Sequence, residues 1–480
     1  MVKKGQKAGE ETAEYSSLKP NPPPHPPTFN RRTKTTPQIG EKNDREQDFH
    51  DHGLVLDQPD KWCIYRVPSK LRKVNEAAYT PQLLSIGVFH YGKPELKDME
   101  THKNMYYKNF SARCSKEDDE LKKFVWARQE QILRCYAYAG TIKLEKHPVD
   151  IIVVDACFII ELFLMNSPET NNHENNYILR SPWLRKAVEQ ELILFENQLP
   201  YSLLQELYDF AVPASCSPHS QERSGDHYID VSEAEPVPDH PFLKLTCEFF
   251  KDYSKGKSVK NGVEPKHFTD LVRHFLCPEE EMTFVHNACP IKNIYAVRKL
   301  KAAGVKFTPL HEDGHFIIKG DKPTKCKFNL ACFRNMNLKL AQFCVKDETE
   351  FVIRNIMALE QFLYPDKPYI CNYFLLMDQL VDTVEDVDLL VENKVIVNML
   401  GSNKAVAKLV NRLCEQIMED KSCYADVCKQ LNKHYENFWN HNVATLKRVY
   451  FKDLWTGSST ILGLFVLVFS IIGSIKSLKS

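Results

Sequence analysis

The last part of the chain contains the feature that most restricts its fold. Residues 456–475 carry no charged side chain and consist largely of Ile, Leu, Val and Phe. At about 1.5 Å per residue, about twenty helical residues cover the roughly 30 Å hydrocarbon core of a bilayer. The sequence therefore predicts a single transmembrane helix at 456–475, with Lys476 and Lys479 among the headgroups beyond it. Because this segment leaves the ribosome last, we expect the bulk of the chain to stay in the cytosol.

The remainder has the composition of an ordinary globular protein. The 480 residues include 63 basic and 63 acidic side chains, a balance that gives no support to nucleic-acid binding. No apolar block follows Met1, so we expect no secretory signal and no glycosylation of the sequon at Asn109. The fifteen cysteines include no C-x-x-C pair, which favours reduced and mostly buried thiols over a disulfide scaffold.

Shifts in composition divide the chain into five predicted parts. Residues 1–58 are polar and rich in proline, and cannot bury enough apolar surface to offset the entropy of ordering. We interpret this arm as a disordered spacer, with docking of Lys19–Pro27 on an SH3- or WW-type groove as the alternative. The other parts are an N-terminal helical lobe (59–211), an exposed loop (212–240), a C-terminal lobe with a small sheet and a stalk helix (241–453), and the transmembrane helix (456–475).

Apolar side chains at a spacing of 3.6 residues predict a mainly α, helix-rich domain of two lobes. Residues 151–165 are apolar apart from two carboxylates, and are too short to span a bilayer, so they predict a buried core helix. Ser115 with Asp118, and Asp347 with Glu350, are predicted capping boxes. Further helices are predicted from these boxes, from Ser181–Pro182 before a break at Pro200, and over 373–391, 402–418 and 426–450.

Three short runs bounded by Gly, Pro and Asn predict a small antiparallel β element. They are 316–318, 325–332 and 338–345.

Several ordered motifs can be compared with a known family. They are Ile64–Pro68, Tyr79–Gln82, Ile86–Gly92, Met99–Lys103, Asp155–Leu162, Phe195–Pro200, Leu300–Phe307, Asn355–Gln361, Asp378–Asp388 and Tyr450–Phe451. Together they resemble the plant family called domain of unknown function 247, whose members are UPF0481-like, from Trp62 to the C-terminus. Val88 and Ala156 depart from the proline and glycine usual there. The resemblance implies a helix-rich plant protein with one C-terminal membrane segment and no established enzymatic activity. Some members are implicated in self-incompatibility in grasses, which makes recognition or signalling a theme of the family.

A buried ion pair is one candidate polar feature. Arg128 lies in the middle of an apolar stripe, where a guanidinium needs a carboxylate. Asp155 or Glu161 is the expected partner, and snorkelling of Arg128 to the surface is the alternative. If all three side chains converged in a cleft between the lobes, they would indicate an unrecognised enzyme or small-ligand binder.

Two other patterns invite a metal interpretation that their context disfavours. His311–His315 matches H-E-x-x-H, but Asp313–Gly314 predicts a turn, so the histidines would flank a hairpin instead of sharing a helical face. Asp378, Asp382 and Asp386 recur every four residues and would line one side of a helix. Without EF-hand spacing, a solvated or salt-bridged face is the simpler interpretation.

The polar groups of Glu196–Gln198 and Glu360–Gln361 stand beside apolar runs. They predict buried hydrogen-bond networks that hold a turn or a helix end, with a catalytic carboxylate pair as the alternative. The sequence has no G-x-S-x-G, P-loop or G-x-G-x-x-G motif. We therefore assign no catalytic, cofactor-binding or metal-binding residue, and expect no cofactor.

The preferred hypothesis is a membrane-anchored, non-enzymatic protein that acts in recognition or signalling through protein interactions. Ser459 with Gly463, and Ser470 with Ser474, are small-xxx-small pairs that would permit self-association through the transmembrane helix. The alternative is the enzyme or small-ligand binder described above. A tether between membranes is a third hypothesis.

Overall fold

The computed structural model describes residues 58–114, 116–137, 144–168, 176–213, 240–255, 264–278, 282, 290–291, 293–310, 315–320, 336–437 and 454–479. The chain divides into two units, Met1–Gly53 and Leu54–Ser480. Nearly all of the predicted disordered arm, and most of the predicted loop at 212–240, lie outside the described residues. The division of the second unit into two lobes stays a prediction.

Helices account for most of the described residues, as predicted. The first half contains α1 (Ser69–Arg72), η1 (Glu76–Ala78), η2 (Pro94–Leu96), α2 (Lys97–Cys114), α3 (Asp118–Trp126), α4 (Gln129–Arg134), α5 (Pro148–Asn166), α6 (Pro182–Glu191), α7 (Tyr201–Ala211), α8 (Pro241–Phe249), α9 (Lys251–Ser254) and α10 (Phe268–Leu276). The second half contains α11 (Val297–Ala302), α12 (Thr349–Leu363), α13 (Tyr369–Leu380), α14 (Val384–Glu392), α15 (Asn403–Leu413), α16 (Ala425–Glu436) and α18 (Leu454–Lys479).

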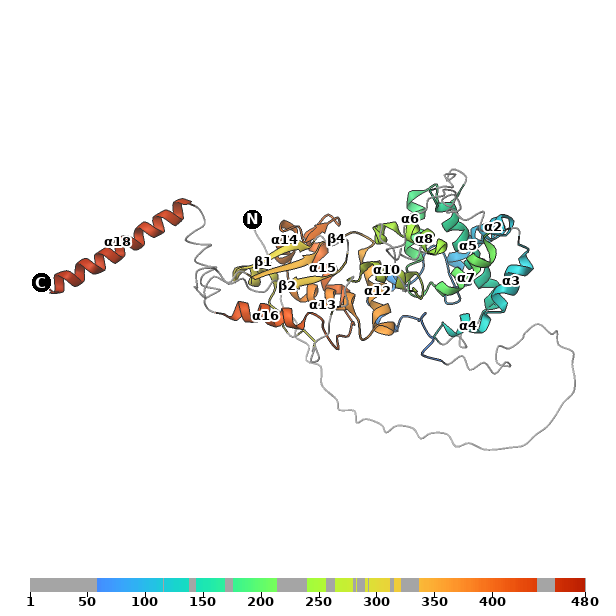
Figure 1. The fold of residues 1–480 in the computed structure, drawn as a ribbon, viewed down its shortest axis with the longest axis horizontal. Helices are drawn as coiled ribbons and strands as arrows, with labels where there is room; N and C mark the ends of the chain where they lie inside the picture. The colour runs from blue at the N-terminus through green and yellow to red at the C-terminus, as the bar shows by residue number, and fades with distance from the viewer. Residues whose placement is uncertain are drawn as a thin grey trace, which may run out of the picture. The chain divides into compact units, whose positions relative to one another are not determined.

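Helix α5 lies at the centre of the first half. It is apolar around its whole circumference, and its residues from Ile159 to Leu164 are all buried. A helix with this pattern needs neighbours on every side. Helices α2, α3, α7 and α8 provide them by packing against it, and Figure 1 shows these helices gathered around α5. The predicted buried core helix at 151–165 is therefore confirmed.

Helix α12 connects the two halves of the described fold. It packs against α10 and η1 on one side and against α13 and α15 on the other. Its Asn355 is fully buried, and the side-chain Nδ2 donates to the carbonyl of Ala78 at 2.7 Å. Oδ1 of the same residue accepts from the backbone N–H of Phe195 at 3.0 Å. One amide side chain thus links three segments that are distant in the sequence.

The predicted small sheet is present, but only one of its strand pairs is antiparallel as predicted. Strand β3 (Met336–Ala341) pairs in parallel with β1 (Val305–Leu310), and antiparallel with β2 (Ile318–Gly320). Strands β4 (Phe343–Val345) and β5 (Ile396–Asn398) form a second, parallel pair. The predicted runs at 316–318 and 338–345 overlap β2, β3 and β4. Their partners β1 and β5 come from segments that were not predicted as strands. The predicted strand at 325–332 lies outside the described residues.

Two helices that were predicted as continuous are interrupted. The backbone at Arg128 leaves the helical region, with φ −110° and ψ 5°, and separates α3 from α4. Thr383 is extended, with φ −134° and ψ 171°, and separates α13 from α14. In both places the apolar stripe continues across the break, so periodicity alone did not reveal it.

Helix ends were predicted with mixed success. Ser181 caps α6 as expected, accepting from the N–H of Leu184 at 3.3 Å. The predicted box of Ser115 and Asp118 is wrong for α3, because Glu117 and Glu120 form the box two residues later. The predicted box of Asp347 and Glu350 is also wrong. There Thr349 accepts from the N–H of Lys346, and Glu350 pairs with Arg354 instead.

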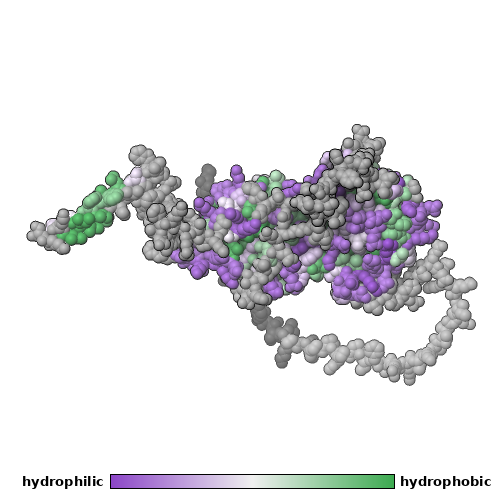
Figure 2. All heavy atoms as spheres, viewed as in Figure 1, coloured by the Kyte–Doolittle hydropathy of each residue, from purple (hydrophilic) through white to green (hydrophobic). Residues whose placement is uncertain are grey.

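The C-terminal segment forms helix α18, and α16 precedes it. The predicted stalk helix at 426–450 is described only as far as 437. Large apolar side chains of α18 are exposed, and Figure 2 shows this helix as a mainly hydrophobic element. Among the described residues, no helix is long and apolar enough to cross a membrane, so insertion of this segment stays a prediction.

Candidate functional site

The three residues proposed to share a cleft are held in three separate ion pairs. Arg128 was expected to meet Asp155 or Glu161, but its Nε donates to Glu206 on α7 at 2.5 Å. The Arg128 guanidinium also lies 3.6 Å from the ring centre of Phe124, and it is partly exposed. The predicted partner was therefore wrong, and the alternative of a guanidinium near the surface describes it better.

Glu161 and Asp155 have other partners, and both are buried. The Glu161 carboxylate accepts two hydrogen bonds of 2.8 Å from Arg113, in the paired geometry typical of arginine and carboxylates. Asp155 Oδ1 accepts from the ammonium of Lys103 at 2.5 Å. These two carboxylates are six residues apart on α5, so they point in different directions and cannot act on one substrate.

Asp155 belongs to a buried polar centre that several sequence motifs build together. Its Oδ2 accepts from the backbone N–H of Gly87 at 2.8 Å, while Lys103 also donates to the carbonyl of Ser85 at 2.8 Å. Burial raises the pKa of Asp155 to about 6, although Lys103 and Gly87 oppose the shift. Burial also opposes the charge on Lys103, but Asp155 and Glu100 outweigh it and raise the lysine pKa. Both groups are therefore charged at neutral pH.

The segment Phe195–Pro200 supplies the other half of this centre. Asn197 Oδ1 accepts from the N–H of Ile86 at 2.6 Å, and its Nδ2 donates to the carbonyls of Leu84 and Glu191. Gln198 Nε2 donates to two carbonyls after α6, and its Oε1 accepts from the N–H of Phe268 at 3.0 Å. Both amides are fully buried. The predicted role of Glu196–Gln198 in holding a turn is therefore confirmed.

Glu196 accepts hydrogen bonds from the N–H of Val67, from Arg72 and from Nε2 of His90, the last at 2.9 Å. Burial alone would raise the carboxyl pKa, but His90 and Arg72 outweigh it and lower the pKa of Glu196. Burial also lowers the pKa of His90, so its ring is neutral and donates through Nε2. The remaining ring nitrogen, Nδ1, is buried and has no hydrogen-bond partner among the described residues.

The second predicted network also holds a helix end. Glu360 is fully buried and accepts from the backbone N–H groups of Ile370 and Cys371, in the first turn of α13. Its Oε1 also accepts from Arg273 of α10 at 2.9 Å. Burial raises the pKa of Glu360, although Arg273 and the two backbone N–H groups act to lower it. This carboxylate joins three helices and is not accessible to a substrate.

The acidic triplet does not form a single face, which corrects the prediction. Asp378 lies in the last turn of α13. Asp386 lies in the first turn of α14, beyond the break. Asp386 caps its own helix by accepting from the N–H of Thr383, and it accepts from the N–H of Arg298 at 2.8 Å. Most of the H-E-x-x-H stretch lies outside the described residues. In the part of the chain that is described, no group of three His, Cys, Asp or Glu side chains is arranged to hold a metal.

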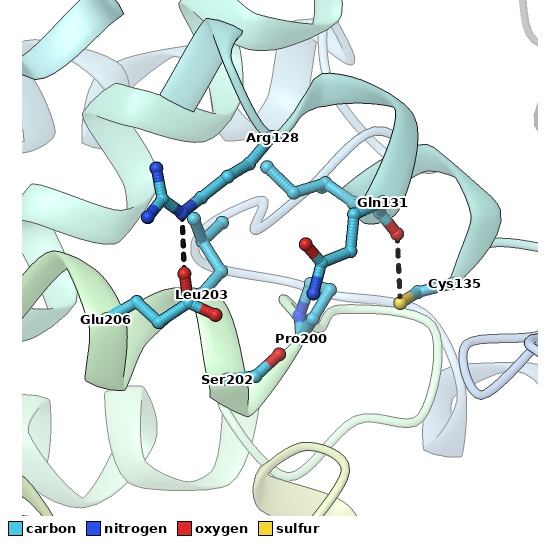
Figure 3. Close-up of a pocket in the computed structure, with 8 residues that line it drawn as sticks. Arg128, Gln131, Cys135, Pro200, Ser202, Leu203 and Glu206 are labelled. Atoms are coloured by element: carbon cyan, nitrogen blue, oxygen red, sulfur yellow. Dashed lines mark hydrogen bonds and ion pairs between the residues drawn. The ribbon is translucent and has the colours of Figure 1, made fainter. Parts of the chain in front are cut away.

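A small pocket lies where α4 faces the start of α7. Its lining includes Arg128 and Cys135 on one side, and Pro200, Ser202 and Glu206 on the other. Figure 3 shows the Arg128–Glu206 pair at one end and the Cys135 thiol at the other. Besides this ion pair and this thiol, the side chains of Gln131 and Ser202 line the pocket.

Lys103, Arg113 and His90 were missed as members of these networks. Lys103 shares one helical face with Met99, Tyr106 and Phe110, all of which are buried. A charged residue on an apolar stripe predicts a buried partner, so the 3.6-residue spacing could have located Lys103. His90 lies in an irregular segment without periodicity, and the sequence contains no equivalent signal for it.

Comparison with known proteins agrees with the motifs that build these networks. Residues 64–469 match the family model DUF247, described as plant protein of unknown function. The chain is 25% identical to UPF0481 protein At3g47200 of Arabidopsis thaliana over 87% of this chain and 86% of that one. It is 22% identical to a second Arabidopsis thaliana protein of that group, At3g02645, over 82% of this chain and 85% of that one. No solved structure matches it. The chain is a member of the plant DUF247 family.

Proposed function

We propose that this protein is anchored in a membrane by its C-terminal segment and acts in recognition or signalling through protein interactions, without enzymatic activity. The observation that carries the proposal is the position of the motif side chains. Asp155, Asn197, Gln198 and Glu360 are all fully buried and bonded to other parts of the fold. Their chemistry is used to hold segments together, which leaves recognition to the surface.

The membrane part of the proposal rests on residues 456–475. The run contains no charge, and exposed side chains of α18 such as Phe465, Leu467 and Phe469 are more than half accessible to solvent. Exposed apolar surface of this extent is unfavourable in water and favourable in lipid. A membrane would cover it without requiring a partner protein.

Exposed aromatic side chains support the recognition part. Trp183 is 75% exposed in the first turn of α6, immediately after Pro182. Tryptophan is among the residues that contribute most to binding energy at protein interfaces. The Ser181 cap and the fixed proline φ hold this turn in place, so Trp183 is presented on a rigid helix end.

Membrane attachment can be tested by placing charges in the apolar run. The variant Val466→Lys with Phe469→Lys adds two cations near its centre, each costing about 2.5–3.5 kcal/mol for insertion. The matched control, Ser477→Lys, adds a cation beyond the run. Carbonate extraction should release the double variant and leave the wild type and the control in the membrane pellet. Equal release of all three would contradict the membrane anchor.

Recognition can be tested by photo-cross-linking of the full-length protein in plant cells. Trp183→Ala should remove a cross-linked adduct that the wild type forms. Met418→Ala is the matched control, since Met418 is 77% exposed on a different segment. The control should retain the adduct. Identical adducts in all three proteins would show that Trp183 does not contact a partner.

His90 favours a second candidate function, that of a small-ligand binder or an unrecognised enzyme. The buried Nδ1 of His90 has no hydrogen-bond partner among the described residues, and a bound ligand would supply one. Thermal-shift measurements with small metabolites test this function. A compound that stabilises the wild type but not His90→Gln would support it, and no stabilisation of the wild type by any compound would count against it.

A further inference from the structure

Two cysteines from distant parts of the sequence lie side by side. The backbone N–H groups of Cys63 and Ile64 both donate to the carbonyl of Cys135 at 2.9 Å, and Ala137 N–H donates back to Ile64 at 2.9 Å. Ile64 and Tyr136 form a parallel bridge, so Cys63 and Cys135 occupy neighbouring positions in the same register. Adjacent strands are about 4.8 Å apart, within the roughly 4.4–6.8 Å Cα separation that a disulfide requires.

The two side chains point to the same side of this bridge and interact. Successive residues of an extended segment alternate in direction, so paired residues in register share a side. The neighbouring sulfurs also affect each other's pKa values. The pair therefore has the backbone spacing that disulfide formation needs, with both side chains on one side of the bridge.

The two sulfurs differ in their access to solvent. Cys63 is buried, at 6% exposure, whereas Cys135 is only partly buried and lines the pocket between α4 and α7. Figure 3 shows the Cys135 sulfur in that pocket, where the thiol donates a hydrogen bond to the carbonyl of Gln131 at 3.5 Å. A small oxidant can therefore reach Cys135 first, with Cys63 behind it.

The surroundings favour the reactive form of Cys135. The neighbouring Cys63 thiol and the positive charge of Lys266 both lower the pKa of Cys135, and burial opposes them. The neighbouring Cys135 and burial raise the pKa of Cys63, so Cys63 keeps its proton. Thiolate is the nucleophilic form of cysteine, so the reaction should begin at Cys135.

We propose that Cys135 is a peroxide-reactive modification site and that Cys63 resolves its oxidised form into an intramolecular disulfide. The inference is independent of the membrane and recognition roles proposed above. It concerns a reversible modification, and in a reducing compartment disulfides are usually catalytic or redox-sensing.

The chemistry proceeds in two balanced steps with hydrogen peroxide as the oxidant. The Cys135 thiolate attacks one peroxide oxygen, the O–O bond breaks, and sulfenic acid and hydroxide form. The sulfur of Cys63 then attacks the Cys135 sulfur, its proton joins the departing hydroxide, and water leaves as the S–S bond forms. Overall, the two cysteine sulfurs are oxidised by one electron each, and peroxide is reduced to one hydroxide and one water. A thiol reductant reverses the modification.

The disulfide would hold the segment around Cys63 in place against the rest of the fold. Tyr65 stacks on Phe195 and Phe362, and the carbonyl of Cys63 accepts from Nε2 of His267 at 3.0 Å. This segment therefore touches α10 and α12 as well as Cys135, which directly follows α4. A covalent bond at Cys63 closes a long loop and restricts the unfolded chain. Oxidation should consequently raise the midpoint of thermal unfolding, and reductant should restore the original value.

The test is peptide mapping by mass spectrometry of the full-length protein after treatment with dilute hydrogen peroxide. The wild type should contain a Cys63–Cys135 cross-linked peptide that disappears on reduction. Cys63→Ser should lose this peptide and accumulate a Cys135 adduct with dimedone, a reagent that traps sulfenic acids. Cys344→Ser is the matched control, because Cys344 is also partly exposed, and it should retain the cross-link.

The wild-type map decides the question even where a variant fails to fold. Oxidation of Cys344 with Cys135 left unmodified would overturn the reactivity of Cys135. Persistent sulfenic acid on Cys135 in the wild type, without the cross-linked peptide, would overturn the resolving role of Cys63. The cross-linked peptide in oxidised wild type, and its absence from Cys63→Ser, is the supporting result.

Discussion

At the scale of single residues, Glu196 shows what the family motifs do. Its carboxylate is 2% exposed, yet three donors from the 64–90 segment converge on it. A buried charge is tolerated when such donors replace its lost water. Glu196 therefore fixes Val67, Arg72 and His90 relative to the loop before α7. The same carboxylate would be unfavourable if any of these donors were removed.

Replacement of Glu196 should be much more damaging than replacement of an exposed partner of an ion pair. We expect Glu196→Ala to lower the free energy of unfolding by about 3 kcal/mol, since it leaves buried donors unpaired. Glu206→Ala breaks the partly exposed pair with Arg128 and should cost less than about 1 kcal/mol. Urea unfolding of both variants measures the difference. Equal losses would contradict the structural role of Glu196.

Glu191 should give the stability a distinct dependence on pH. Burial raises its pKa to about 7 from the ordinary value of 4.5, against hydrogen bonds from backbone N–H groups that include that of Gln82. The folded state therefore holds the proton more tightly than the unfolded state. The resulting stability is fully present below about pH 4.5 and is lost as pH rises through about 7.

The variant Glu191→Gln should remove that part of the pH dependence while it keeps an acceptor for Gln82. The free energy of unfolding should fall between about pH 5 and about pH 8 by about 2–3 kcal/mol more in the wild type than in the variant. Glu95→Gln, at an exposed position, is the control and should behave as the wild type. Parallel pH profiles for all three proteins would show that Glu191 titrates normally.

The residue scale also shows what sequence reasoning could reach. An arginine on the apolar stripe of 121–139 predicted a buried ion pair; Arg128 does pair with a carboxylate, but the pair is partly exposed. The choice of partner failed because the helix breaks at Arg128 and redirects its side chain toward α7. The interaction of His90 with Glu196 could not be predicted, since it depends on how an irregular segment folds back.

At the scale of elements, the irregular segment 84–90 depends on one glycine. Gly87 has φ +70°, and a Cβ added there would lie 2.6 Å from both the carbonyl oxygen of Gln198 and the hydroxyl of Tyr136. That hydroxyl already donates to the same carbonyl at 2.7 Å. The backbone of Gly87 is thus held directly against two other segments, where only glycine fits.

The substitution Gly87→Ala should destabilise the protein by about 2–4 kcal/mol, because left-handed strain and overpacking add together. Gly92→Ala is a matched control with the same backbone strain, since Gly92 has φ +83° and no atom within 4 Å of an added Cβ. It should cost only about 1 kcal/mol. Thermal unfolding of the two variants tests the contact, and equal costs would show that only the φ angle matters.

Element type was predictable where local chemistry decides it. The apolar run of α5 and the cap at Ser181 both gave correct helices, because burial and capping are set by adjacent residues. The breaks at Arg128 and Thr383, and the parallel partners of β3 and β4, were missed. Those features depend on contacts between distant segments, which periodicity does not contain.

At the scale of the whole molecule, five of the family motifs form one continuous framework. Segments 64–68, 86–92, 155–162 and 195–200 meet through Glu196, Asp155 and Gly87. The motif beginning at Asn355 joins them through its contacts with Ala78 and Phe195. The exposed residues of this chain can therefore change without disturbing this buried framework. Such an arrangement suits a protein whose proposed role is recognition at its surface.

Membrane topology is the measurement that tests the proposed function most directly. An added glycosylation site beyond Ser480 reports on the C-terminus, while Asn109 reports on the body, because it is exposed on α2. We predict glycan addition at the C-terminal site, no glycan at Asn109, and resistance to carbonate extraction. A glycan at Asn109, or an unmodified C-terminal site on an extractable protein, would contradict a cytosolic body anchored by its C-terminal helix.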